Sequence, residues 1–329
     1  MSVKERLSMV KSNDLLKLKE VEEQIIGMDI GRGCVKAQSE FDGETYSCMF
    51  KSIIGLGRKL DFDKYDDPIY IEVDDDGMDY FVGHLAEIEA DLPIHNTSDD
   101  KVSDIAKTLV CACLNEIAVS DQVKIMLGVP KKLYTKKILN EVINAYKGKT
   151  FKIKNKIKST FKKVTINDIM ICREADSAIL EQYELAANLI NSKVAMAVMG
   201  FKTLELAYYN EGFKFNDKKS KTIELGNLTM LKYVQDRLQE NEKLTKDLAE
   251  IDSSANYDDW KLKGNKVLLN SFNIALERTW VNLTDVTIFC AGGTLLNLKD
   301  FPDFNYELVS DPQMAVARGL YIAGTKHFN

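Results

Sequence analysis

Apolar and polar residues alternate in short runs through the first quarter of the chain, and turns containing glycine or aspartate separate the runs. The run from Ile25 to Ile30 precedes Gly31-Arg32-Gly33, and a second extended run leads to the turn Asp42-Gly43. Strands are expected over residues 25–30, 34–40, 45–50, 69–73 and 79–82, with Asp74-Asp75-Asp76-Gly77 as the turn of the last pair. Because no helix separates the first three strands, the pattern predicts a β-meander and not a β-α-β unit.

Helical and strand-like segments alternate in the remainder of the chain. Helices are expected over residues 99–119, 131–146, 174–190, 226–251 and 258–280, and from about residue 312, with Ser98 or Asp99 capping the first. Strands are expected over residues 123–129, 193–199, 203–210 and 286–290, and a β-ribbon over 149–171. A charged amphipathic helix is expected over residues 1–24, either as a contact element for a partner or another copy, or packed on or fraying from its own domain.

The two halves of the chain repeat one pattern, in which an apolar strand, a glycine turn and a return strand precede the helices. Steps 0, +2 and +7 of the turns are occupied by Asp29, Gly31 and Lys36 in the first half and by Val198, Gly200 and Glu205 in the second. A duplicated β-β-β-α-β-α unit predicts two lobes with a ligand-binding cleft between them. We expect one lobe over residues 25–190, with residues 312–329 returning to it, and the other over residues 191–311.

Composition narrows the class of protein. The 329 residues are 45% hydrophobic and 29% charged, and only 18 Gly and 5 Pro leave no room for a long linker. The formal net charge of -6 disfavours non-specific binding of nucleic acid. No apolar run approaches the ~20 residues that a membrane span requires, so we expect a cytoplasmic protein without direct membrane contact. Six scattered cysteines and three histidines offer neither a zinc ligand set nor a Ser-His-Asp arrangement.

The first glycine turn carries the clearest candidate chemistry. Glycines at positions 31 and 33 allow backbone N–H groups to surround a phosphate, and Lys36 supplies a positive charge from the return strand. Asp29, at the end of the incoming strand, is placed to hold Mg²⁺ through its waters. Taken alone, the same residues also fit an ordinary hairpin with an exposed Asp and Lys. The matching turn in the second half favours a phosphate site.

The order of motifs along the chain resembles that of the actin-like ATPases, and most of all the plasmid-segregation actins of the ParM type. The motifs are Asp29-x-Gly31-x-x-x-x-Lys36, Tyr80-Phe81-Val82-Gly83-x-x-Ala86, Leu127-Gly128-Val129-Pro130, Glu174-Ala175, Gly200-x-x-Thr203, Glu224-Leu225-Gly226 and Ala291-Gly292-Gly293-Thr294. They extend over nearly the whole chain, from about residue 25 to about residue 324. The resemblance implies an α/β, actin-like (ribonuclease H-like) two-lobed ATPase fold with a central nucleotide cleft.

The resemblance also implies roles for individual residues, with ATP and Mg²⁺ as cofactors. Gly31, Arg32, Gly33, Cys34 and Lys36 would form the first phosphate loop, and Gly200, Phe201, Lys202 and Thr203 the second. Gly292, Gly293 and Thr294 would border the adenosine, and Glu224 and Gly226 the ribose or base. Asp29 would serve the metal, and Glu174 would lie near the attacking water, where a carboxylate can orient it or accept its proton. Two alternatives remain from the residues themselves: Glu174 as a helix N-terminal carboxylate, and Gly292-Gly293-Thr294 as a tight turn and cap.

One departure from the family pattern concerns the second phosphate loop. The family's loop usually opens with an aspartate that helps to hold Mg²⁺ and the attacking water, whereas this chain has Val198 there. Because valine cannot bind a metal's water, we expect slow hydrolysis, or hydrolysis that depends on Asp29 and Glu174. Lys202 could add charge near the terminal phosphate, and Glu205 matches an acidic position on the return strand.

A lysine-rich segment lies at residues 147–163, with lysines at 147, 149, 152, 154, 156, 158, 162 and 163. Alternation predicts a strand with lysines on one face and Phe151, Ile153 and Ile157 on the other. The face would either be solvated and protect a sheet edge, or contact an acidic neighbour along a filament, or DNA.

By resemblance, the function is ATP-dependent assembly into head-to-tail filaments that segregate or position DNA, such as a plasmid, through a small DNA-binding adaptor. Two alternatives stay open. One is a nucleotide-bound scaffold that does not hydrolyse ATP, suggested by Val198. The other is a monomeric small-molecule kinase on the same fold, which would need a second substrate pocket that the long polar helices of residues 226–280 do not suggest.

Overall fold

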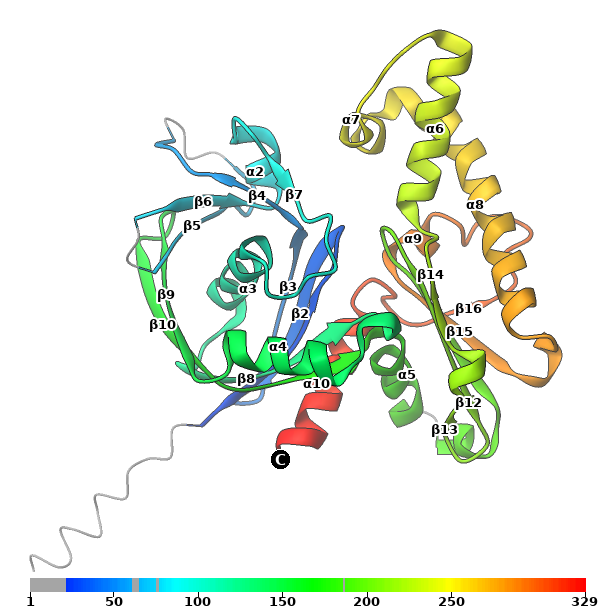
Figure 1. Cartoon of the computed structure of the whole chain (residues 1–329), viewed down its shortest axis with the longest axis horizontal. Coiled ribbons are helices and arrows are strands. Elements are labelled where there is room, and N and C mark those ends of the chain that lie inside the picture. Colours follow the sequence, from blue (N-terminus) through cyan, green and yellow to red (C-terminus); the bar gives the residue numbers. More distant parts are fainter. Residues whose placement is uncertain (1–21, 61–64, 75–76, 186) are drawn as a thin grey trace, which may run out of the picture.

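The computed structural model describes residues 22–60, 65–74, 77–185 and 187–329, and it has two lobes (Figure 1). One lobe is built on a ten-stranded sheet and the other on a six-stranded sheet. The helix expected over residues 1–24 falls almost entirely outside the described residues. Among the described residues, no helix combines the length and the apolar character needed to cross a membrane.

The first lobe begins with the predicted meander. β1 (Gln24–Ile30), β2 (Cys34–Phe41) and β3 (Glu44–Lys51) pair antiparallel, and β8 (Gln122–Val129) pairs parallel to β1 on its other side. The other strands are β4 (Ile53–Leu56), β5 (Ile69–Val73), β6 (Asp79–Val82), β7 (Ile94–His95), β9 (Lys149–Asn155) and β10 (Thr160–Arg173). Their order is β3-β2-β1-β8-β10-β9-β5-β6-β4-β7. The sequence pattern did not predict β4, β7 or the short helix α2 (His84–Glu89).

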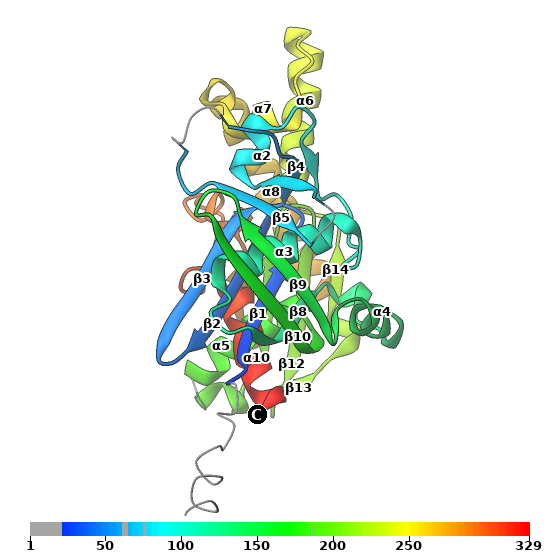
Figure 2. The same cartoon turned by 90° about the vertical axis from the view of Figure 1, so that its left-hand side faces the viewer.

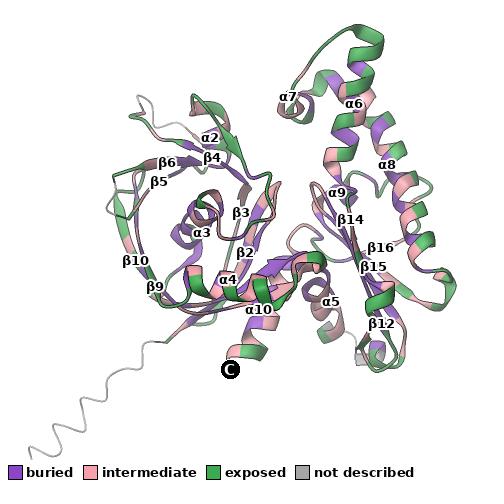
Figure 3. Ribbon diagram, in the orientation of Figure 1, coloured by how far each residue is buried: buried purple, intermediate pink, exposed green. Residues whose placement is uncertain are grey.

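Helix α3 (Asp104–Ile117) lies inside the curve of this sheet (Figure 1) and is buried over most of its surface (Figure 3). Its small residues, such as Ala112 and Cys113, allow strands to pack around it. The predicted cap at Ser98 or Asp99 was wrong, because Ser103 caps the helix by accepting a hydrogen bond from the backbone N–H of Ala106. Asp99 instead forms ion pairs with Arg32 and Lys132.

The second lobe repeats the arrangement of the first. β11 (Val194–Met199) pairs antiparallel with β12 (Leu204–Asn210) and parallel with β15 (Thr287–Ala291), as β1 does with β2 and β8. The third strand of the repeat is reduced to the short β13 (Lys214–Phe215) and β14 (Lys221–Ile223), both paired with β12. β16 (Glu307–Leu308) lies beside β15. The duplicated architecture predicted from the two glycine turns is therefore confirmed, with a shortened third strand in the second copy.

The helices of the second lobe are α6 (Asn227–Glu242), α7 (Leu248–Ser253), α8 (Asp258–Thr279) and α9 (Gly293–Leu296). The single helix predicted over residues 226–251 was wrong, since α6 ends at Lys243 in the left-handed conformation and α7 starts after Asp247. Hydrophobic residues of α6 and α8, including Leu231, Val234 and Phe272, form one core with the inner face of the sheet.

Two helices join the lobes at the base of the molecule (Figure 1). α5 (Glu174–Leu185) packs against β11 and against α10 (Ala315–Phe328), and α10 also packs on β1 and β8. The C-terminal helix therefore lies on the first lobe. The helix predicted over residues 174–190 was too long, because a 3-10 turn over Ala187–Asn191 follows α5.

The lysine-rich segment forms the long β9–β10 hairpin, which crosses the outer side of the first lobe (Figure 2). The predicted strand was too long: β9 ends at Asn155, whose side chain accepts hydrogen bonds from the N–H groups of Ile157 and Lys158 and closes the turn. Ile157 is consequently exposed. Several lysines pair within the lobe: Lys147 with Asp168, Lys154 and Lys156 with Glu72, and Lys162 with the carbonyls of Asn115 and Ala118. Helix α4 (Lys136–Tyr146) precedes the hairpin.

Candidate functional site

The first glycine turn, residues 31–33, connects β1 to β2. Three polar side chains donate hydrogen bonds to its backbone carbonyls or to the carbonyl just before it. Ser52 and Asn96 donate hydrogen bonds to the carbonyl of Gly31, at 2.6 and 3.3 Å. The buried ammonium of Lys101 donates to the carbonyl of Ile30 at 2.7 Å. None of the three was predicted from the sequence, since nothing local marks a serine, an asparagine or a lysine as a support for a distant turn.

The second turn, residues 200–203, connects β11 to β12 and receives two other loops of its own lobe. The hydroxyl of Thr294 donates to the carbonyl of Gly200 at 2.9 Å, and the N–H of Leu228 donates to the carbonyl of Phe201 at 2.7 Å. A Cβ added to Gly226 would lie 2.4 Å from the carbonyl oxygen of Gly200. Only glycine permits this approach. The segments predicted to border the ribose and the adenosine therefore lie against the second glycine turn.

The third glycine segment, at the end of β15, also needs glycine for a close backbone approach. Gly292 has φ +98, and a Cβ there would lie 2.2 Å from the carbonyl oxygen of Met199. Gly293 lies instead against the side chain of Gln313. The turn thus packs closely against the end of β11, where a side chain at position 292 would not fit.

The two glycine turns meet across the lobes. A Cβ built on Gly33 would lie 2.9 Å from Cβ of Phe201, and Nη2 of Arg32 donates a hydrogen bond to the hydroxyl of Thr203 at 3.4 Å. The residues predicted to face one ligand from opposite lobes are therefore neighbours. Cys34 begins β2 beside the turn, and burial raises the pKa of its thiol, which keeps it protonated and unreactive.

An acidic centre lies beneath the turns. Asp29 is buried and faces Lys36, whose Nζ lies 3.3 Å from Oδ2 of Asp29. Burial alone would lower the pKa of Lys36, but the negative charges of Asp29 and Glu174 raise it above its ordinary value. Burial and the nearby Asp29 carboxylate raise the pKa of Glu174 to about 8. Glu174 therefore holds a proton at neutral pH unless a cation enters the centre.

Glu205 brings a carboxylate to this centre from the second lobe. Its Oε2 accepts hydrogen bonds from the backbone N–H of Lys131 at 3.0 Å and from the hydroxyl of Thr222 at 2.8 Å. Its Oε1 is buried without a hydrogen-bond partner among the described residues. Burial raises the pKa of Glu205 to about 7. A buried carboxylate oxygen without a partner is costly, which suits a centre that receives a cation or a bound water.

These features fit a magnesium nucleotide better than a metal held by the protein alone. Among the described residues, no group of three or more His, Cys, Asp or Glu side chains could hold a metal ion. Mg²⁺ usually keeps several waters and takes one or two carboxylates together with substrate phosphates. Asp29 could supply such a carboxylate beside the glycine turns. Burial is the main cause of the raised pKa values of Glu174 and Glu205, so a cation entering the centre would favour their ionised forms.

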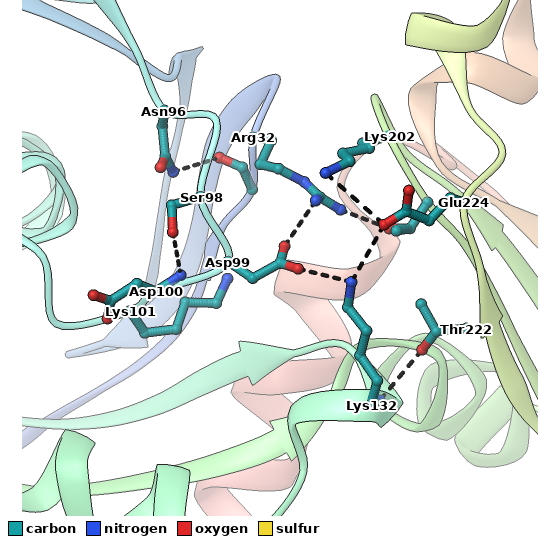
Figure 4. A network of polar contacts seen from close by, with 12 residues as sticks. Arg32, Asn96, Ser98, Asp99, Asp100, Lys101, Lys132, Lys202, Thr222 and Glu224 are labelled. Carbon is teal, nitrogen blue, oxygen red and sulfur yellow. Dashed lines mark hydrogen bonds and ion pairs between the residues drawn. The ribbon is translucent and has the colours of Figure 1, made fainter.

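A chain of ion pairs crosses between the lobes beside the two turns (Figure 4). Arg32 and Lys132 each lie 2.9 Å from an oxygen of Asp99, and Lys132 and Lys202 lie 3.8 and 3.9 Å from Oε1 of Glu224. Burial would raise the pKa of Asp99, but Lys132 and Arg32 hold it below its ordinary value. Asp99 and Lys132 were missed as site residues. The position of Lys132, two residues after the Leu-Gly-Val-Pro motif at the end of β8, was the one signal that could have indicated it.

Comparisons with known proteins agree with this architecture. Residues 27–175 match the family model described as the N terminal domain of actin like proteins. No curated protein matches the chain in sequence. The chain is similar in structure to a ParM of a 15-stranded filament from Clostridium botulinum, with 19% identity and a TM-score of 0.76 over 93% of this chain and 99% of that one.

Two further solved structures carry nucleotide. The archaeal actin homolog Ta0583 in complex with ADP has 14% identity and a TM-score of 0.73 over 92% of this chain and 99% of that one. ParM from Bacillus thuringiensis with ATP has 15% identity and a TM-score of 0.63 over 93% of this chain and 100% of that one. The chain thus has the actin-like fold, as its sequence predicted.

Proposed function

We propose that this chain is an ATP-dependent, filament-forming actin-like protein of the ParM type, which binds ATP and Mg²⁺ between its two glycine turns. The observation that carries the proposal is the contact between Gly33 and Phe201, which brings the turns of opposite lobes together. The similar structures with ATP and with ADP support nucleotide as the ligand. The filament of the Clostridium botulinum ParM supports assembly.

In this proposal the chain positions the nucleotide and the attacking water, and it supplies charge that balances the phosphates. The turns at Gly31 and Gly200 cradle the phosphates, Lys36 neutralises them, and Gly226 and Gly292 allow the nucleoside segments to approach. When bound, Mg²⁺ neutralises charge on the phosphate oxygens, and Asp29 would hold it through water. Glu174 orients the attacking water once it has lost its proton.

Assembly would follow from head-to-tail contacts that do not close into a ring. A ligand that touches both lobes fixes the angle between them, and that angle sets how one subunit fits the next. By resemblance, the cargo is DNA, such as a plasmid, coupled through a small DNA-binding adaptor. The net charge of -6 and the pairing of lysines within the β9–β10 hairpin support an adaptor over direct DNA contact.

Sedimentation and light scattering of the purified protein at micromolar concentration test this function. Assembly with ATP, and less or none with ADP, supports a dynamic filament, whereas phosphoryl transfer to a small acceptor by a monomer would indicate a kinase.

A second candidate is a nucleotide-bound scaffold that does not hydrolyse ATP. The valine at position 198 and the proton that Glu174 holds at neutral pH both favour it. The two candidates differ in phosphate released per nucleotide bound, since a scaffold assembles with ATP and releases almost none.

A further inference from the structure

Three basic side chains from both lobes converge beside the phosphate turns (Figure 4). Arg32 belongs to the first turn, Lys132 follows β8 in the first lobe, and Lys202 belongs to the second turn. Two carboxylates, Asp99 and Glu224, hold them in one chain of contacts. Three positive charges thus face two negative ones, and the cluster has an excess of positive charge.

The pairing within the cluster is incomplete. The side chain of Arg32 is only 8% exposed, yet its Nη1, although 2.9 Å from Asp99, makes no hydrogen bond among the described residues. A guanidinium offers five N–H donors in a fixed fork that suits a phosphate. A buried donor without a well-formed hydrogen bond is costly. Arg32 therefore has N–H donors left for a phosphate in addition to its ion pair with Asp99.

The remaining contacts are easily displaced. Glu224 is 66% exposed and reaches Lys132 and Lys202 only at 3.8 and 3.9 Å. Exposed ion pairs of this length contribute little to stability because water and salt screen them. A phosphate group with two negative charges would attract both lysines more strongly than the single charge of Glu224 does.

We propose that Arg32, Lys132 and Lys202 form a terminal-phosphate clamp, which distinguishes a nucleoside triphosphate from a diphosphate, and that Asp99 and Glu224 hold these cations when no nucleotide is bound. The clamp rests on the proposed function, because it needs a nucleotide between the turns. It names which residues of this chain bind the end of the polyphosphate. Since Lys202 comes from the second lobe and the other two from the first, the terminal phosphate would join the lobes.

Binding of ATP, ADP, inorganic tripolyphosphate and pyrophosphate, measured by calorimetry, tests the clamp. The wild type should bind ATP about tenfold or more tightly than ADP, and tripolyphosphate more tightly than pyrophosphate. R32A and the double variant K132A/K202A should each weaken ATP binding by about tenfold while changing ADP binding by no more than about threefold. R32K should lie between R32A and the wild type, since it keeps the charge and loses the fork.

Two further variants separate the clamp from general effects of charge. K137A removes an exposed lysine of α4 outside the cluster and should leave all four affinities unchanged. E224Q removes the competing carboxylate and should tighten ATP binding more than ADP binding. Equal affinities for ATP and ADP in the wild type, or equal losses for both in R32A and K132A/K202A, would overturn the clamp and leave the proposed function standing. A wild type that binds no nucleotide at all would overturn the proposed function as well.

Discussion

Val198 lies directly opposite Glu205 across β11 and β12, in the same register that places Asp29 opposite Lys36 across β1 and β2. The two lobes therefore present equivalent positions with different chemistry. The first lobe has an acid on the incoming strand and a base on the return strand. The second lobe has lost the acid on the incoming strand and carries one on the return strand.

Restoring the acid tests the importance of this difference. Val198→Asp would place a carboxylate beside Glu205 in a buried position, so it should lower the melting temperature of the nucleotide-free protein. With Mg²⁺ and ATP, it should speed phosphate release by on the order of 10²-fold, the scale of one preorganised electrostatic group. Val198→Asn is the matched control of similar shape without charge. Equal rates for the two variants would contradict a role for the missing carboxylate.

Glu174 predicts a pH dependence of turnover. Because its pKa is raised to about 8, the ionised form that can orient water increases as the pH rises through that value. The value of kcat/KM for ATP, which reflects the free protein, should therefore rise with pH across this range. Glu174→Gln should lower kcat/KM by about 10²–10⁴-fold and remove the rise. A rise that persists in Glu174→Gln would assign it to another group.

The same shift predicts a pH dependence of stability. Between the ordinary value of 4.5 and about 8, the folded protein holds a proton on Glu174 that the unfolded chain releases. Stability therefore falls as the pH rises through this window. Without nucleotide, Glu174→Gln should melt higher than the wild type at about pH 8, by on the order of 5 °C, and the gap should narrow at about pH 5. A gap that does not change with pH would mean that charge is not its cause.

The contact between the two turns predicts a coupled pair of substitutions. Gly33→Ala would place a Cβ 2.9 Å from Cβ of Phe201 and push the turns apart, so ATP affinity should fall by about tenfold. Phe201→Ala leaves that Cβ in place but removes the ring, whose nearest atom would lie 3.4 Å away, so the double variant should recover part of the loss. Additive losses in calorimetric titrations would show that the turns do not touch when ATP is bound.

The sequence allowed the architecture to be predicted because the repeat is local. The strand, turn and return strand around Asp29 and around Val198 carry their signals in short stretches of alternating residues and glycine. The boundaries of β5 and β6 were predicted to the residue for the same reason. Elements with few residues, such as β7 and β16, could not be predicted, since two residues carry no period.

The supports of the site were less predictable than its turns. Asp99 has the local signature of a helix cap, and only the position of Arg32 and Lys132 in space makes it an ion-pair partner. Lys101 is a buried lysine whose partner carbonyl lies 71 residues away in the chain. Contacts between residues so distant in sequence depend on the fold as a whole, which no spacing within one segment reveals.

Electron microscopy of the purified protein with ATP, with ADP and without nucleotide tests the central claim most directly. The claim is that a nucleotide held between the turns at Gly31 and Gly200 controls how subunits associate. We expect filaments with ATP and Mg²⁺, and few or none with ADP or without nucleotide. A protein that stays monomeric at high concentration in all three conditions, or forms the same filaments in all three, would contradict it.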